Sequence, residues 1–296
     1  LALDKIEHLL QDIVLNNENP TALRPINVYD ICMHAADAVL SGGVRRSATI
    51  CLFSPTDEEM MTAKTGNWFV DNPQRGRSNN SAILLREKTT AKQFSELMKS
   101  VKEFGEPGFV WSDSTELIVN PCVEIGMWPV DEQTGKSGWQ GCNLSTINCS
   151  SLVDEDDFYE RCKAAAIIGT LQAGFTNLDY LGQVSKDIFD REALLGVSLT
   201  GIMEKHELVL TEKVLKKGAK IAVDTNQKLA KLITINQAAR VTCLKPEGTS
   251  SSMLGTSSGI HPHHAKRYIR HVQANILEAP YPVSYTHLTL PTILLV

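Results

Sequence analysis

The sequence lacks several features that would place the protein in a specialised class. Its 296 residues carry a formal net charge of −5, so no excess of positive charge favours nucleic-acid binding. No apolar run reaches the length of a membrane-spanning helix, and the first residues do not open a signal peptide. The seven cysteines are odd in number and show no repeated spacing, which argues against a secreted disulfide framework. We therefore expect a globular protein of a reducing, cytoplasmic setting, without nucleic-acid or membrane partners.

Apolar periodicity predicts a chain in which helices alternate with short strands. The expected helices are 3–15, 28–40, 90–104, 156–181 and 211–239, and the expected strands are 48–53, 82–85 and 196–201. This alternation favours an α/β fold over an α+β fold. The chain starts without Met inside an apparent helix, which predicts a fragment. We place one domain over 1–280, and we expect 281–296, which has no charged residue and no period, to be a non-native or disordered tail.

The segment Asn120-Pro121-Cys122-Val123-Glu124 is dense in reactive groups. A thiol and a carboxylate two residues apart lie on the same side of an extended segment, and Pro121 favours a stiff loop over a helix. Cys142 follows in a second polar stretch. These residues fit a redox site, but free cysteines are more often small core residues. The core interpretation is favoured for the other five: Cys32, Cys51, Cys149, Cys162 and Cys243.

A second polar segment runs from Lys245 to Ser252, Lys-Pro-Glu-Gly-Thr-Ser-Ser-Ser. Gly248 permits a tight turn, and the hydroxyls that follow can donate beside free backbone amides. If a helix begins here, its N-terminus would attract a phosphate. The alternative is a plain Ser/Thr-rich loop with a helix cap.

Three further polar stretches have less specific chemistry. The loop 42–47 carries two arginines that would meet a nucleotide or lie in solvent, and 75–81 is equally ambiguous. His261, His263 and His264 lie close together, but Pro262 stiffens the run and no second Cys/His cluster completes a set of ligands. We expect no metal site there.

Taken together and in this order, these segments resemble the catalytic subunit of the ribonucleotide reductases, and most nearly the adenosylcobalamin-dependent class II enzymes. The resemblance runs from about Pro25 to Asn275. It is carried by the segments 42–48, 77–81, 120–124, 141–144, 199–201, 245–251 and 258–262.

The resemblance implies a fragment of a ten-stranded αβ barrel, truncated at both ends, with a finger loop carrying a radical cysteine into its centre. Cys122 matches that cysteine, which as a thiyl radical takes the 3′ hydrogen of the ribose and must be buried because water would quench it. Glu124 matches the carboxylate that accepts the 3′-hydroxyl proton, and Asn120 the amide that holds the ribose. Cys142 matches one of two thiols that reduce the 2′ carbon, and its partner in the family lies upstream of this chain.

The resemblance also implies two binding loops. The phosphate-binding loop comprises Pro246, Glu247, Gly248, Thr249, Ser250 and Ser251. The loop that conveys base specificity comprises Gly43, Val44, Arg45, Arg46 and Ser47. Glu247 departs from many relatives, which have Ser there, and a carboxylate beside phosphates needs a neutralising cation such as Lys245.

The implied activity is an oxidoreductase that reduces ribonucleoside di- or triphosphates with adenosylcobalamin, a deoxynucleotide effector and a thioredoxin-type reductant. We expect the fragment alone to be inactive. Glu124 speaks against the glycyl-radical class. Three alternatives stay open: a diiron-dependent reductase, a non-catalytic nucleotide-binding module, and a hydrolase with Cys122 as nucleophile, which needs a histidine base such as His261.

Overall fold

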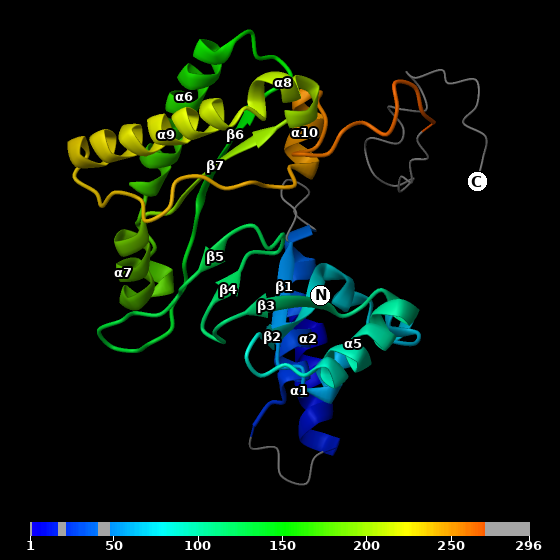
Figure 1. Ribbon diagram of the computed structural model, residues 1–296. Helices are drawn as coiled ribbons and strands as arrows, with labels where there is room; N and C mark the ends of the chain where they lie inside the picture. Colours follow the sequence, from blue (N-terminus) through cyan, green and yellow to red (C-terminus); the bar gives the residue numbers. More distant parts are fainter. Residues whose placement is uncertain (1, 17–21, 41–47, 270–296) are drawn as a thin grey trace, which may run out of the picture. The chain divides into compact units, whose positions relative to one another are not determined.

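The computed structural model describes residues 2–16, 22–40 and 48–269 (Figure 1). The described residues up to His261 belong to one unit, and those from Pro262 to Ile269 belong to a second. The predicted boundary near 280 and the predicted tail lie outside the described residues, as does the predicted specificity loop 43–47.

The first layer of the larger unit is a parallel sheet in the order β1-β2-β3, as the predicted α/β class requires. Its strands are β1 (Thr49–Phe53), β2 (Ser78–Leu85) and β3 (Gly108–Ser112). The helices around it are α1 (Ala2–Asn16), α2 (Pro25–Leu40), α3 (Glu58–Met61), α4 (Trp68–Asp71) and α5 (Ala91–Phe104), with the 3-10 turn η1 (Pro73–Arg77) before β2. Met33 of α2, Met60 of α3 and Leu97 of α5 pack with Leu84 of β2 in its apolar core.

Local sequence signals explain why α5 forms where it does. The Thr90 hydroxyl accepts a hydrogen bond from the Gln93 amide, and the Gln93 side chain accepts one from the Thr90 amide. These two hydrogen bonds form a complete capping box. Gly105 ends the helix in the left-handed conformation, with φ of 72°. Both boundaries agree with the predicted helix.

Strand β2 begins earlier than predicted because its first polar residues have a buried partner. The Tyr29 hydroxyl hydrogen-bonds with Ser78 (2.7 Å) and donates to Asn80 (2.8 Å). Burial raises the pKa of Tyr29 to about 12, so this hydroxyl keeps its proton. The strand alternation then points Asn79, between them, to the opposite face.

A short antiparallel hairpin joins the two halves of the unit. It consists of β4 (Ile118–Val119) and β5 (Gly126–Met127), and it pairs Val119 with Gly126. The turn of this hairpin is the predicted radical-cysteine segment.

The second layer is built on two parallel strands, β6 (Asn143–Asn148) and β7 (Leu195–Thr200), and Figure 1 shows α6 and α9 beside them. The helices are α6 (Glu155–Ala173), α7 (Gln183–Glu192), α8 (His206–Val209), α9 (Glu212–Leu232) and α10 (Gly248–Leu254), with 3-10 turns η2 (Asp179–Leu181) and η3 (Ile202–Lys205). Phe158, Leu195 and Val214 join the core between helices and strands.

Two predicted helices run too far in sequence. Helix α6 ends at Ala173 rather than 181, since Gly174 caps it and a loop follows. Helix α9 ends at Leu232 rather than 239, because the chain turns at Thr234, whose φ is 61°. Apolar residues continue beyond the ends of both helices, so hydrophobic periodicity alone does not predict where the helices end.

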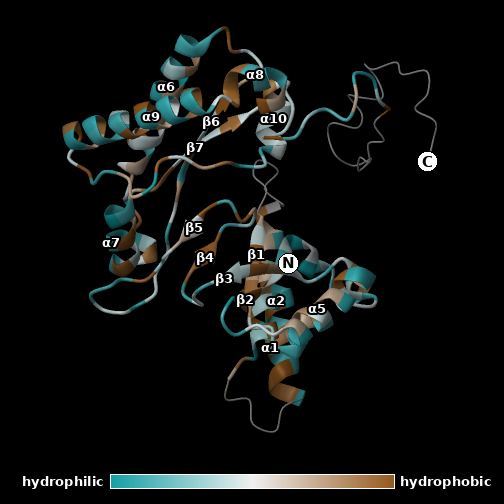
Figure 2. Ribbon diagram, in the orientation of Figure 1, coloured by the Kyte–Doolittle hydropathy of each residue, from teal (hydrophilic) through white to brown (hydrophobic). Residues whose placement is uncertain are grey.

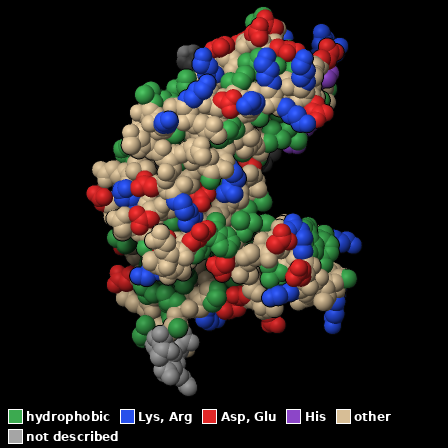
Figure 3. Space-filling view, turned by 60° about the vertical axis from the view of Figure 1, so that its left-hand side comes forward, with side chains coloured by type: hydrophobic (Ala, Val, Ile, Leu, Met, Phe, Trp, Pro, Cys, Tyr) green, Lys and Arg blue, Asp and Glu red, His purple; other side chains and the backbone are tan. Residues whose placement is uncertain are grey.

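Figure 2 shows apolar residues gathered on strands and on one side of the helices. Charges of both signs are mixed on the face of the molecule that is seen in Figure 3. No helix within the described ranges is both long and apolar enough to cross a bilayer.

Candidate active site

The predicted radical-cysteine segment is a tight turn rather than an extended strand. The Val123 amide donates to the Asn120 carbonyl (2.8 Å), and the Ile125 amide donates to Asn120 Oδ1 (3.0 Å). Val123 has a φ of 64°, which is unusual for a β-branched residue and stores backbone strain. The prediction of a stiff, non-helical loop is confirmed, but the thiol and carboxylate do not share one side of an extended segment.

Because of this turn, the Cys122 thiol and the Glu124 carboxylate differ in their exposure to solvent. Cys122 is exposed at the tip, contrary to the expected burial, because the chain reverses there. The Glu124 side chain points inward and is only 5% exposed. Neither carboxylate oxygen of Glu124 has a hydrogen-bond partner in the described structure. The buried, reactive member of the segment is therefore the carboxylate.

Two long-range hydrogen bonds hold the hairpin. Asn79 Nδ2 donates to the Pro121 carbonyl (3.1 Å), and Arg240 Nη2 donates to the Gly126 carbonyl (3.0 Å). Asn79 belongs to a motif whose chemistry was ambiguous from sequence, and the strand alternation of β2 aims it at the turn. Nothing in the sequence pattern singles out Arg240.

Glu124 faces a lysine and two cysteines from the second layer. Lys245 Nζ lies 3.9 Å from Glu124 Oε1, an ion pair too long for a hydrogen bond. Burial raises the pKa of Cys142 to about 12 and that of Cys243 to about 11, with the nearby Glu124 charge adding to both increases and Lys245 opposing them. The structure thus brings Cys142 and Glu124 together, as predicted.

The prediction that the remaining five cysteines are core residues holds for some of them and not for others. Cys149 and Cys162 are buried core residues, as predicted. Cys32 is exposed, and Cys51 is only partly buried. Cys243 is wrongly predicted as a plain core residue, because it lies beside Cys142 and Glu124. The sequence does offer one signal for a role of Cys243 near the site, because it lies two residues before the polar segment that begins at Lys245.

The segment 245–259 is hydrogen-bonded to β7 at both of its ends. The Lys245 amide donates to Ser198 Oγ (3.0 Å), and the Gly259 amide donates to Thr200 Oγ1 (3.0 Å). The Thr200 hydroxyl in turn donates to the Ser257 carbonyl (3.0 Å). Both ends of the segment are therefore fixed to alternate residues of one strand.

Between these ends lies the predicted phosphate-binding loop. Glu247 has a φ of 54° and precedes α10, so the free amides of the helix begin at Gly248. Space is open around the Gly248 Cα, where an added Cβ would meet nothing within 4 Å. Glu247 Oε2 accepts from the Ser250 hydroxyl, while Glu247 Oε1 is buried without a partner. The expected neutralising residue, Lys245, instead lies beside Glu124.

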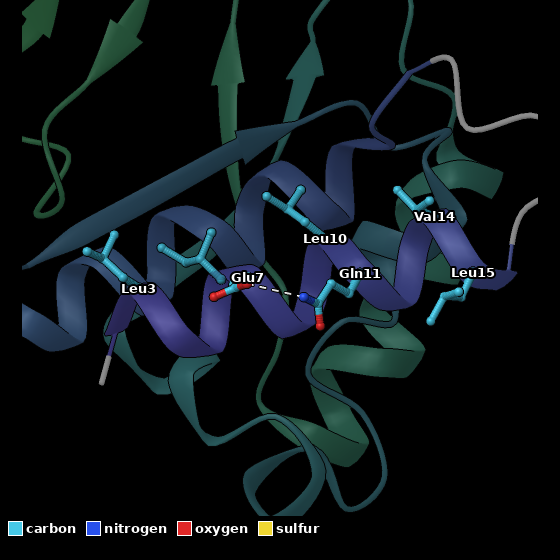
Figure 4. Close-up of a pocket in the computed structure, with 7 residues that line it drawn as sticks. Leu3, Glu7, Leu10, Gln11, Val14 and Leu15 are labelled. Atoms are coloured by element: carbon cyan, nitrogen blue, oxygen red, sulfur yellow. Dashed lines mark hydrogen bonds between the residues drawn. The ribbon is translucent and has the colours of Figure 1, made fainter.

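Two other features do not contribute to this site. The described part of the chain holds no group of three or more His, Cys, Asp or Glu side chains placed for a metal ion, and His261, His263 and His264 are exposed. A shallow pocket follows one face of α1, lined by Leu3, Leu10 and Val14 with the Glu7–Gln11 hydrogen bond (Figure 4). It contains none of the predicted site residues.

The chain is similar to several known proteins. No model of a protein family matches the chain. It is 24% identical to the adenosylcobalamin-dependent ribonucleoside-triphosphate reductase of Lactobacillus delbrueckii subsp. bulgaricus, over 90% of this chain and 40% of that protein. It is 27% identical to a probable reductase of the same name from Dictyostelium discoideum, over 83% of this chain and 33% of that protein. The chain thus spans about 40% or less of the length of these curated relatives.

The solved structures decide the fold. A B12-dependent, class II ribonucleotide reductase matches with a TM-score of 0.65 and 21% identity, over 86% of this chain and 40% of that one. The chain has the fold of the ribonucleotide reductases. The alpha subunit of the class Id ribonucleotide reductase of Actinobacillus ureae matches less closely, with a TM-score of 0.53 and 13% identity over 80% of this chain and 53% of that one. The resemblance to class II ribonucleotide reductases and the barrel-fragment fold expected from it are confirmed.

Proposed function

We propose that the protein to which this chain belongs is an adenosylcobalamin-dependent ribonucleotide reductase. It would reduce ribonucleoside di- or triphosphates at the ribose 2′ carbon for deoxyribonucleotide synthesis. The observation that carries this proposal is the Glu124 carboxylate, buried without a hydrogen-bond donor, two residues from an exposed thiol and beside the Cys142 thiol. The relatives named above support the reaction and the cofactor.

Glu124 is suited to accept a proton from the substrate. A buried carboxylate without a hydrogen bond is unfavourable by roughly 1–3 kcal/mol or more, so an incoming hydroxyl group would relieve that penalty. The ribose 3′-hydroxyl would supply this donor, and its proton would pass to Glu124 as the 3′ hydrogen leaves. Until the sugar binds, the positive charge of Lys245 would partly offset the cost of burying the negative charge of Glu124.

Cys122 is suited to meet a radical source that binds as a separate molecule. Its thiol is exposed at the tip of a turn that Asn79 and Arg240 hold by backbone hydrogen bonds. When bound, adenosylcobalamin would supply the unpaired electron that lets the Cys122 sulfur take the 3′ hydrogen. Within the described residues, Cys122 is the group that would face it.

Asn120 and Cys142 would complete the sugar site. The Asn120 carbonyl and Oδ1 already shape the turn, so its Nδ2 is the group that would donate to the ribose. Cys142 keeps its proton at neutral pH because burial raises its pKa to about 12. A protonated thiol carries both the proton and the electron that reduction at the 2′ carbon consumes.

The substrate phosphates would bind at the start of α10. The residues proposed for this role are Pro246, Glu247, Gly248, Thr249, Ser250 and Ser251. Base specificity through 43–47, a deoxynucleotide effector and a thioredoxin-type reductant belong to the same proposal. A reducing compartment such as the cytoplasm would keep the thiols of Cys122 and Cys142 free.

A cysteine replacement in the full-length protein tests the proposal. Cys122→Ser should abolish ribonucleotide reduction in the presence of adenosylcobalamin and a dithiol, with nucleotide affinity by calorimetry unchanged. Cys162→Ser, in the core away from the site, is the matched control and should keep activity. Activity retained by Cys122→Ser would refute the assignment, and activity that needs a diiron partner instead of cobalamin would move the protein to the diiron class.

A further inference from the structure

The hairpin of β4 and β5 has a second edge, which faces away from β4. The Ile125 carbonyl faces β4, because it accepts from the Asn120 amide (3.4 Å). Backbone groups alternate between the two edges of an extended strand, so the opposite edge carries the carbonyls of Gly126, Trp128 and Val130. Carbonyls on the edge of a strand need hydrogen-bond donors from another strand, from side chains or from water.

Two arginine side chains supply these donors. Arg240 Nη2 donates to the Gly126 carbonyl (3.0 Å). Arg191, in the last turn of α7, donates through Nη1 to the Val130 carbonyl (2.8 Å) and through Nη2 to the Trp128 carbonyl (3.2 Å). Three alternate carbonyls of one strand edge are therefore held by two guanidinium groups, whose several fixed donors suit such contacts.

Glu192 lies between the two arginines and joins them. Its Oε1 accepts from Arg191 Nε (2.9 Å), and its Oε2 lies 3.9 Å from Arg240 Nη2. Its backbone carbonyl accepts from the Ala239 amide (2.9 Å), and the Arg240 carbonyl accepts from the Leu195 amide (3.1 Å) at the start of β7. We call Arg191, Glu192 and Arg240 the arginine clamp, and its backbone belongs to the second layer.

The second layer also carries the groups that face Glu124. Cys142 directly precedes β6, which pairs with β7. The Lys245 amide donates to Ser198 Oγ of β7 (3.0 Å). Glu124 itself lies two residues before β5, so the position of β5 against the second layer sets where Glu124 lies relative to Cys142 and Lys245.

We propose that the arginine clamp consists of positioning residues of the proposed reductase. It fixes β5 to the second layer and thereby holds Glu124 and Cys122 in place relative to Cys142. The proposal rests on the proposed function for its role in turnover. A displacement of about 1 Å at reacting groups can lower a rate by about a hundredfold. Loss of the clamp should therefore lower kcat, whereas KM should change little because the phosphates would bind at α10.

Turnover of the full-length protein with adenosylcobalamin and a dithiol tests this role. Arg191→Met removes both donations to the hairpin and keeps a long apolar side chain, so kcat should fall about ten- to a hundredfold, with KM within about twofold. Arg191→Lys keeps a positive charge beside Glu192 and can reach one carbonyl, so its kcat should lie between those of Arg191→Met and the wild type. Arg240→Met loses one carbonyl contact and should show a milder fall, and it serves if Arg191→Met does not fold.

Arg161 offers a matched control, because it makes the same kinds of contact on another element. Its side chain is 32% exposed, against 31% for Arg191. It donates to the carbonyls of Asn148 and Ser151 (both 3.0 Å) and pairs with Asp157 (2.9 Å). Arg161→Met should cost similar stability in urea unfolding but leave kcat nearly unchanged. An equal loss of kcat in Arg161→Met and Arg191→Met would overturn the positioning role.

Hydrogen exchange of the full-length protein, without nucleotide or cobalamin, separates this proposal from the proposed function. Amides of 118–130, followed by mass spectrometry, should exchange several times faster in Arg191→Met than in the wild type or in Arg161→Met. Unchanged exchange in both Arg191→Met and Arg240→Met would overturn the clamp. Faster exchange with kcat within about twofold of the wild type would overturn its positioning role. If the wild type reduces no nucleotide, the proposed function falls, and exchange still decides whether the clamp holds the hairpin.

Discussion

The ion pair between Lys245 and Glu124 is a buried interaction without a hydrogen bond, and its removal should be measurable. At 3.9 Å, two unit charges attract by about 4 kcal/mol at an effective dielectric of 20. Desolvation of the ammonium group, which is 22% exposed, offsets part of this attraction. We expect Lys245→Met to lower the free energy of unfolding by roughly 2 kcal/mol, because it leaves Glu124 buried and uncompensated.

The assay is urea unfolding followed by tryptophan fluorescence, on both single variants and the double variant. Glu124→Gln should change stability by less than about 1 kcal/mol, since it removes a charge that has no hydrogen bond to lose. In that background Lys245→Met should have little further effect, which gives a coupling of about 2 kcal/mol. Lys216→Met, which breaks the exposed pair with Glu212, is the control and should be nearly silent. Strict additivity of the two single changes would refute the reasoning.

Three further experiments test other parts of the molecule. Val123→Gly should raise the unfolding free energy by about 0.5–1 kcal/mol in thermal unfolding, because glycine accepts the positive φ without strain; a loss would mean that the valine side chain stabilises the turn. At pH 8, iodoacetamide should label Cys142 at least about tenfold more slowly than the exposed Cys122, and the Cys142 rate should climb as pH rises toward its pKa of about 12; equal rates at pH 8 would contradict the burial of Cys142. Gly201→Ala should destabilise the protein more than Gly105→Ala, since both have φ near 70° but only the first places its Cβ against a neighbouring hydroxyl; equal losses would show that backbone strain alone matters.

Local structure was largely predictable because its causes are local. The α5 helix has a capping box at Thr90 and a left-handed glycine at Gly105, and both are readable as residue types at fixed spacing. Strand β1 follows from a short β-branched run. Two predicted helices run too far because a turn interrupts an apolar pattern, at Gly174 and at Thr234. Other elements lie outside every predicted range, among them β3, β6 and α7.

For the candidate site, the sequence singles out residues but not their geometry. The family resemblance singles out Cys122, Glu124 and Cys142, whereas the period-two rule places the first two on one side of a strand. The positive φ of Val123 and the Asn120 carbonyl convert that stretch into a turn, and nothing in the pattern announces this. Because of this turn, the Cys122 thiol is exposed and the Glu124 carboxylate is buried.

The approach of Lys245 and Cys243 to the site could not be predicted from spacing. Both lie far along the chain from Glu124, and they reach it because the segment after Thr242 runs beside β7. Such a contact depends on which strands become neighbours. A single sequence does not specify that neighbourhood.

Fixing the segment 245–259 at both ends to β7 has a consequence for how it opens. Ser198 holds one end and Thr200 the other, so the segment forms a closed ring with the strand as its base. A ring of this kind can detach as one cooperative unit, while the strand beneath keeps its own ladder. Loss of the Thr200 hydroxyl would leave the far end held, because the Gly201 and Ile202 amides donate to the Ser257 and Gly259 carbonyls. Glu204 also accepts from the Thr256 hydroxyl and the Ser257 amide. The far end therefore opens only when several contacts break together.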